Sequence, residues 1–192
     1  MKSINYLLLF IICTLSVSCA KTNSEQSNSN ELTQKQVQLK DEGWIFVQHK
    51  GGEMESKYGV KSKYGIQDNY FDISVGSGYD VVVKIVDINT DQCIRYIYVP
   101  QNQTITTNEI PQGRYYLKLS YGKDWMEKEA DGITLGKFTR SVIYEKSSSA
   151  YDFGKKNSSE LVDHILKLNV IDGSVENNFR TEEISEEEFM QN

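Results

Sequence analysis

The residues with the clearest potential for chemistry are aromatic and charged side chains that follow the most regular strand pattern of the sequence. Tyr121-Gly122-Lys123-Asp124-Trp125 places a tryptophan after a glycine turn, beside a lysine and an aspartate. Flat aromatic rings with polar tips suit sugar rings and the centres of protein interfaces. One hypothesis is therefore a ligand-binding aromatic sheet face formed by Tyr96, Tyr98, Tyr116, Lys123, Asp124 and Trp125. The alternative, which we favour, is that Trp125 packs against Phe138 and closes one end of the fold.

A second candidate is an acidic stretch between two apolar segments. Asp87-Ile88-Asn89-Thr90-Asp91 matches the opening of a calcium-binding loop. The match fails at its sixth position, Gln92, and its twelfth, Tyr98, where such loops need glycine and a bidentate glutamate. Asp, Asn and Thr are also the ordinary residues of a hairpin turn. We predict a turn and no metal site.

Other catalytic patterns are missing from the sequence. The two histidines, His49 and His164, lie far apart, and neither has the cysteine or carboxylate spacing of a zinc site. No G-x-S-x-G nucleophile motif and no phosphate-binding glycine loop occurs. We therefore predict no catalytic residue and no cofactor, and expect that the chain is not an enzyme.

The N-terminal residues have the pattern of an export signal. Lys2 provides a positive charge, and residues 4–17 form an apolar run. The run is shorter than the roughly 20 apolar residues that a membrane-spanning helix needs. It is typical of a signal peptide.

The end of this run, Leu15-Ser16-Val17-Ser18-Cys19, resembles the lipobox of bacterial lipoproteins, in the relaxed form of Bacteroidetes-type bacteria. Ser16 stands where that family prefers leucine, and Leu15 lies one position earlier. The resemblance implies cleavage after residue 18, acylation of Cys19 and attachment of the exported chain to the bacterial outer membrane through the lipid. Cleavage after Ala20, giving a soluble secreted product, is the alternative. Once Cys13 has left with the signal, Cys93 is the one thiol besides Cys19, and we expect it to be buried and inert.

The remaining chain divides into a tether, a body and a tail. Residues 19–42 are mostly polar, so we predict a disordered, flexible tether, although Leu32, Val37 and Leu39 allow a short helix. The body spans residues 43–180. The tail, residues 181–192, carries five of the glutamates. It ends either as a frayed acidic segment or as a helical turn, capped by Ser185 and Glu188, that docks Phe189.

The body contains a succession of short strand patterns and almost no helical pattern. The clearest is residues 114–121, where Tyr115, Leu117, Leu119 and Tyr121 share one face. Residues 81–86 are apolar on both faces, as in a central strand. Residues 165–171 alternate, which favours a strand, although the spacing of Leu161, Ile165 and Leu168 also allows a helix over residues 161–168. We predict an all-β fold, a single antiparallel β-sandwich of about seven to nine strands. The near-repeat of residues 56–61 in residues 62–67 predicts a loop or hairpin.

Residues 105–117, with a threonine-rich strand, the turn Pro111-Gln112-Gly113 and then Tyr115-Tyr116-Leu117, are similar to carboxypeptidase-regulatory-like and transthyretin-like β-sandwich modules. Such modules are accessory domains without catalytic residues, so the resemblance implies none here. We predict a non-catalytic envelope lipoprotein that acts as a binding or accessory module, with an envelope protein or a glycan as its partner. The alternatives are glycan binding through the aromatic sheet face, or an enzyme whose site is not visible in the sequence.

The net charge of −6 excludes nucleic acid as a partner, because such proteins neutralise phosphates with a basic surface. Most of this acidity belongs to the tail, so the body is close to neutral.

Overall fold

The structure, a computed structural model, describes residues 32–54, 56–157, 160–161, 163–171 and 174–191, which belong to one folded unit. The predicted signal peptide, Cys19 and the first part of the predicted tether lie outside the described residues.

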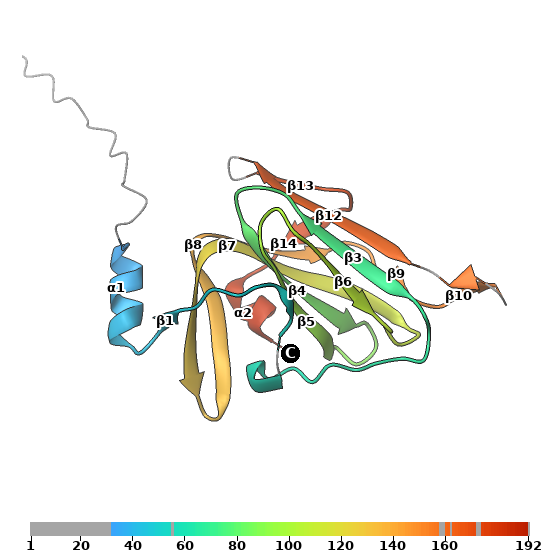
Figure 1. Cartoon of the computed structure of the whole chain (residues 1–192), viewed down its shortest axis with the longest axis horizontal. Coiled ribbons are helices and arrows are strands. Elements are labelled where there is room, and N and C mark those ends of the chain that lie inside the picture. Colours follow the sequence, from blue (N-terminus) through green and yellow to red (C-terminus); the bar gives the residue numbers. More distant parts are fainter. Residues whose placement is uncertain (1–31, 55, 158–159, 162, 172–173, 192) are drawn as a thin grey trace, which may run out of the picture. The chain divides into compact units, whose positions relative to one another are not determined.

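Two β-sheets form the body, as predicted for a β-sandwich (Figure 1). Sheet A contains, in spatial order, β14 (Thr181–Glu183), β8 (Ile133–Ser147), β7 (Arg114–Ala130), β4 (Asp80–Asp87), β5 (Cys93–Val99) and β2 (Gly52–Glu53), and β1 (Ile45–Phe46) and β9 (Tyr151–Asp152) also pair with β7. Sheet B contains β13 (Ser174–Asn177), β12 (His164–Ile171), β3 (Tyr70–Val75) and β6 (Thr104–Asn108). A separate pair is formed by β10 (Lys155–Asn157) and β11 (Glu160–Leu161), and the helical elements are α1 (Gln34–Asp41), the 3-10 turn η1 (Ser56–Tyr58) and α2 (Glu186–Met190).

The main hydrophobic core lies between the two sheets. Alternation in β7 sends Tyr115, Leu117, Leu119 and Tyr121 into this core, as the sequence predicts. Sheet B contributes apolar side chains of β3 and β12, including Phe71, Ile73, Leu166 and Leu168. The strand over residues 164–171 is thereby confirmed against the helical alternative.

The sandwich is antiparallel, as predicted, with the exception of one strand pair. β12 pairs with β3 in parallel, with His164 opposite Phe71 and Leu168 opposite Val75. The remaining pairings among the described strands are antiparallel. The hydrophobic pattern of residues 165–171 sets which side chains face the core, but it does not set strand direction, which depends on the path of the chain between the sheets.

The outer face of sheet A, turned away from sheet B, is also covered. Val82, Val86, Tyr96 and Tyr98 lie in a second buried cluster together with side chains of the loop at residues 54–60 and of α2. This explains why β4 is buried on both faces, as its apolar composition predicts.

The loop at residues 56–67 holds the two similar hexapeptides, which have different environments. Tyr58 and Val60 of the first copy are buried, whereas Tyr64 and Ile66 of the second are exposed. The buried guanidinium of Arg95 anchors the second copy. It bonds the carbonyl of Lys63 and lies over the ring of Tyr64, at 4.0 Å from Cζ to the centroid.

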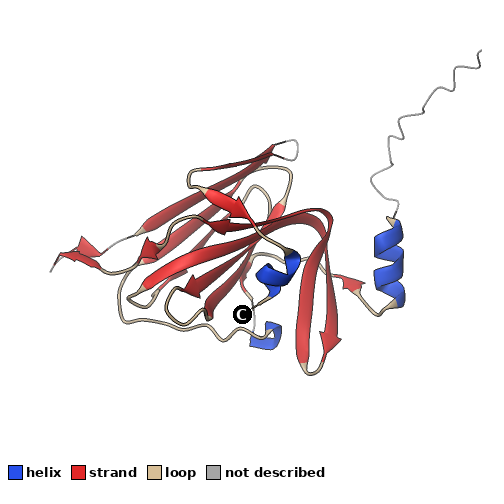
Figure 2. Cartoon of the chain, turned by 180° about the vertical axis from the view of Figure 1, so that it is seen from behind, coloured by secondary structure: helices blue, strands red, loops and turns tan. Residues whose placement is uncertain are grey.

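The hairpin of β7 and β8 extends beyond the sandwich and bends away from it, as Figure 2 shows from behind. Its register shifts between Tyr121 and Lys123, and both Asp124 (φ 58°) and Ser141 (φ 52°) have left-handed backbone conformations. Such irregularities bend a strand pair and increase its twist.

The prediction that a flexible tether extends through residue 42 is wrong in its last part. α1 occupies Gln34–Asp41 and begins with a capping box between Thr33 and Gln36. Its Leu39 packs with Trp44 and Met126 on the projecting hairpin. The sequence of this segment has only a weak amphipathic pattern, which made a helix unexpected. Burial of Leu39 against the hairpin stabilises the helix nevertheless.

The tail is also part of the folded unit rather than a separate segment. β14 pairs with β8, placing Thr181 opposite Ser147. The side chain of Ser185 then caps α2 by accepting a hydrogen bond from the amide of Glu188, and Phe189 is only 2% exposed. Of the two alternatives for this end, the structure confirms the docked helical turn.

Candidate functional site

The bend in the β7–β8 hairpin brings two side chains of β7 over the outer face of sheet A. Trp125 and Glu127 are two residues apart on a strand and therefore lie on the same face. Glycines make room for the aromatic rings there. A Cβ added at Gly136 would lie 2.2 Å from Cζ2 of Trp125, and one at Gly122 would lie 2.4 Å from Cβ of Phe138.

The carboxylate of Glu127 is the centre of the most connected buried polar group on this face. Its Oε1 accepts hydrogen bonds from Trp125 Nε1 at 2.8 Å and from Tyr58 OH at 2.7 Å. His49 Nε2 lies 2.5 Å from the same oxygen and donates a third bond, because an ionised carboxylate only accepts. Side chains from residues 49–58 and from β7, which are far apart in the sequence, thus converge on one oxygen atom.

The same hydrogen bonds set the ionisation of Glu127. Burial by itself would raise the pKa of this carboxyl, but the bonds from Trp125, Tyr58 and His49 together lower it below its ordinary value. Glu127 is therefore ionised at neutral pH, and three donors stabilise its charge.

A pocket of about 290 Å³ adjoins this carboxylate. Aromatic side chains and two lysines line it, along with the backbone of Gly51 and Gly52. The ring of Tyr98 lies 4.9 Å from that of His49 between centroids, and the Tyr98 hydroxyl donates to Asp80 Oδ2 at 2.6 Å. The pocket therefore combines fixed aromatic walls with a buried negative charge and the exposed Lys50 at its rim.

The structure places four of the six side chains in the predicted aromatic face in one buried outer cluster, namely Tyr96, Tyr98, Tyr116 and Trp125. Trp125 and Tyr98 are in contact, with ring centroids 5.5 Å apart, and both are 3% exposed. Trp125 also packs against Phe138, with ring centroids 4.9 Å apart, as the favoured alternative predicts, but it does so over the outer face of sheet A and not at an end of the sandwich. Tyr96 is buried in the same outer cluster. These rings face the interior, because the loop at residues 54–60 and α2 cover the sheet, so they do not form an open surface.

The two charged side chains of the predicted face, Lys123 and Asp124, lie outside this cluster. Asp124 forms an ion pair with Arg140 at 2.9 Å, and the ammonium of Lys123 lies 5.1 Å from the ring centre of Tyr79. Tyr116 belongs to the outer cluster, but its hydroxyl lies at a different cleft beside α2, where it donates to Asp91.

Sequence reasoning missed Glu127, Tyr58 and His49 as members of this site. The one local signal was the spacing of Glu127 two residues after Trp125, which puts both on one strand face. Tyr58 lies in a loop and His49 in a short extended segment. Neither segment has a periodic hydrophobic pattern from which the direction of its side chains could be predicted. Their arrangement depends on contacts across 69 and 78 residues of sequence.

Two further candidates have structural roles. The amides of Asn89 and Thr90 donate to Asp87 Oδ1, so the acidic stretch closes a turn between β4 and β5. Cys93 is buried, and burial raises its thiol pKa to about 11, as expected for an inert cysteine. Among the described residues, no three His, Cys, Asp or Glu side chains lie close enough together to hold a metal ion.

No protein-family model, curated protein or solved structure matches this chain. In the part of the chain that the structure describes, no helix has the length and apolar character needed to span a membrane.

Proposed function

We propose that this chain is a non-catalytic lipoprotein of the bacterial cell envelope whose β-sandwich is a binding or accessory module. The sequence supports the anchor through the apolar run of residues 4–17 and the lipobox-like residues that end at Cys19. The structural observation that carries the binding role is the pocket beside Glu127, whose polar walls are held in place by the packed side chains of Trp125 and Tyr58.

The chemistry of the pocket favours binding over catalysis. Glu127 is ionised and accepts three bonds, so it is poorly suited to act as a general acid at neutral pH. None of the described residues that line the pocket is a serine, threonine or cysteine that could act as a nucleophile. A rigid polar pocket of this kind fits a small polar ligand or one side chain of a protein partner.

Glycan binding through an aromatic sheet face has less support. Stacking on a sugar ring needs an open aromatic face. Tyr96, Tyr98 and Trp125 are each at most 5% exposed. A glycan would have to enter through the pocket rim, where His49 and Lys50 are accessible.

The lipid anchor is tested in the native host with two variants, each of which replaces one cysteine by alanine. We expect Cys19→Ala to abolish palmitate labelling and to release the chain from the membrane fraction. Cys13→Ala is the matched control, because it lies in the same apolar segment, and it should keep both properties. Retention of label and membrane association in Cys19→Ala would refute the lipoprotein assignment.

The binding role is tested by photo-crosslinking in the intact envelope. A photo-reactive amino acid replaces Lys50, which lies at the pocket rim. In a control variant it replaces Lys61, which is exposed and does not line the pocket. We expect a discrete adduct from position 50 that Tyr58→Phe weakens, and none from position 61. The same adducts from both positions, or none from position 50, would count against the pocket as the binding site.

A further inference from the structure

Three lysines lie directly opposite one another on adjacent strands of the outer face of sheet A. Lys84 of β4 is opposite Lys118 of β7, which in turn is opposite Lys146 of β8. We call Lys84, Lys118 and Lys146 the lysine row. Lys84 and Lys118 are each only 3% exposed. Like charges in directly opposed positions destabilise a sheet, and burial strengthens their repulsion. The row therefore needs negative charge or oriented acceptors above it.

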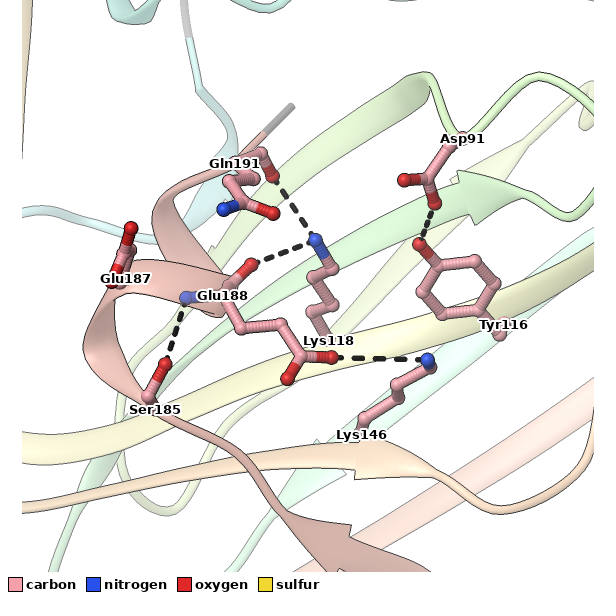
Figure 3. Close-up of a pocket in the computed structure, with 8 residues that line it drawn as sticks. All are labelled: Asp91, Tyr116, Lys118, Lys146, Ser185, Glu187, Glu188 and Gln191. Carbon is pink, nitrogen blue, oxygen red and sulfur yellow. Dashed lines mark hydrogen bonds and ion pairs between the residues drawn. The ribbon is translucent and has the colours of Figure 1, made fainter.

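α2 supplies those acceptors (Figure 3). The ammonium of Lys118 donates to the carbonyl oxygens of Glu188 at 2.8 Å and Gln191 at 3.1 Å, and that of Lys84 donates to the carbonyl of Phe189 at 2.9 Å. The Glu188 carboxylate lies 3.8 Å from the ammonium of Lys146. These carbonyls belong to the negative end of the α2 dipole, which cations stabilise.

The aromatic ring of Phe189 supplies the apolar part of the same contact. It packs against Tyr144 with ring centroids 5.3 Å apart, and the ammonium of Lys84 lies 4.9 Å from its centre. Acidic residues precede the ring along the chain, Glu186 among them, which pairs with Lys137 at 3.2 Å. The surface that α2 covers thus recognises a short acidic segment that ends in an aromatic side chain.

α2 is a short helix that lies over the outer face of sheet A. It has five residues, and a helix of that length is unstable in water without tertiary contacts. Besides the pairing of β14 with β8 that precedes it, α2 is held by Phe189 and the lysine row, whereas the strands beneath it are held by the pairing of β4, β7 and β8. A cleft of about 410 Å³ remains beside it, with Lys118, Lys146 and Tyr116 among its walls, so α2 does not fill the surface.

We propose that the lysine row and the aromatic side chains around it form a docking groove for an acidic, phenylalanine-containing peptide segment of a partner protein, and that α2 occupies this groove in cis. The chemistry of the partner is that of the occupant seen in the structure, with carboxylates toward Lys146 and a ring beside Tyr144. A partner segment must displace α2, so the groove is autoinhibited. The proposal concerns a surface distinct from the Glu127 pocket and does not depend on the lipid anchor.

The test uses a labelled synthetic peptide with the sequence of residues 181–191 and the full chain. Phe189→Ala in the chain removes the ring that holds α2 and leaves the lysine row intact. We expect this variant to bind the peptide at least tenfold more tightly than the unmodified chain, measured by fluorescence anisotropy. Addition of Lys118→Met should weaken this binding at least tenfold. Lys128→Met, on the same strand away from α2, should leave it unchanged.

A second measurement needs no variant of the chain. An excess of the peptide should accelerate hydrogen exchange at the amide of Phe189 in the unmodified protein, because that amide bonds to Ser185 in the docked helix. Amides of β4 should be unaffected, and a peptide in which Phe189 is replaced by alanine should have no effect. The proposal is overturned if α2 exchange is unchanged, or if the peptide binds the Phe189→Ala chain equally well with and without Lys118→Met.

Discussion

The indole Nε1 of Trp125 donates a hydrogen bond at 2.8 Å to Oε1 of Glu127, two residues further along the same strand. Both side chains are nearly buried, at 3% and 6% exposed. The bond therefore holds a charged group inside the protein beside the largest aromatic side chain of the outer cluster. Its removal provides a direct measure of how much this face of the sandwich depends on the polar centre.

Replacement of Glu127 by leucine should destabilise the fold strongly. The change removes the acceptor of the buried Trp125 Nε1 and one of the partners of the Tyr58 hydroxyl, at a cost of about 2 kcal/mol. Urea unfolding followed by circular dichroism measures the loss. Glu127→Gln retains an acceptor oxygen in a similar shape and should lose about half as much. Equal losses for the two variants would show that the charge, and not the unsatisfied donors, dominates.

Acid should destabilise the protein through the same carboxylate. The pKa of Glu127 is lower in the folded chain than its ordinary value of 4.5, so its ionised form stabilises the folded state above that pH. The stabilisation is lost as the pH falls through the folded-state pKa. The pKa of Glu53, which accepts bonds from Thr107 and Ser62, is also lowered and adds to the effect. We expect the free energy of unfolding to fall below about pH 4.5, and Glu127→Gln to make that fall shallower. An identical pH dependence in the variant would contradict the assignment.

A methyl group at position 136 should displace the indole of Trp125. The Cβ of Gly136→Ala would lie 2.2 Å from Cζ2 of that ring, and forced repacking of this kind costs about 2 kcal/mol. Tryptophan emission should shift to longer wavelength as the ring becomes more exposed. Gly132→Ala is the control, because its Cβ meets no atom within 4 Å although its φ is +80°. It should cost about 1 kcal/mol through backbone strain and leave the emission unchanged.

The docking of α1 should depend on a single buried amide. Gln36 is 1% exposed, and its Nε2 donates to Asp124 Oδ2 at 2.9 Å and to Thr139 Oγ1 at 3.0 Å. Gln36→Ala removes both bonds, together with the capping-box bond that the Thr33 amide donates to Gln36 Oε1, and should weaken docking by about 2 kcal/mol, which hydrogen exchange of the α1 amides would detect. Gln38→Ala makes the same chemical change on the exposed side of the helix and should have little effect. Similar exchange rates in the two variants would show that Leu39 alone holds the helix.

The aromatic residues of the predicted ligand face show the limit of reading a site from one strand at a time. Alternation correctly places Tyr115 and Tyr116 on opposite faces of β7, because side-chain direction is a local property of an extended backbone. The outward direction of Tyr96, Tyr98 and Tyr116 then suggested exposure. Exposure is not local, since it depends on what the chain places above the sheet, and here a loop and α2 cover it.

The sequence by itself determined the features that arise from neighbouring residues. Among them are the strand class and facing of residues 114–121, the doubly buried strand at residues 81–86 and the turn at Asp87. Each follows from backbone geometry and from hydrogen bonds that span a few positions.

Only the tertiary structure decided which distant groups meet. It placed β12 parallel to β3, brought His49 and Tyr58 to Glu127, and set three lysines opposite one another beneath α2. The hydrophobic pattern of a strand specifies which of its faces is buried. The pattern does not specify which other segment of the chain covers that face. The partner is chosen by the path of the whole chain, and a single local segment does not contain that information.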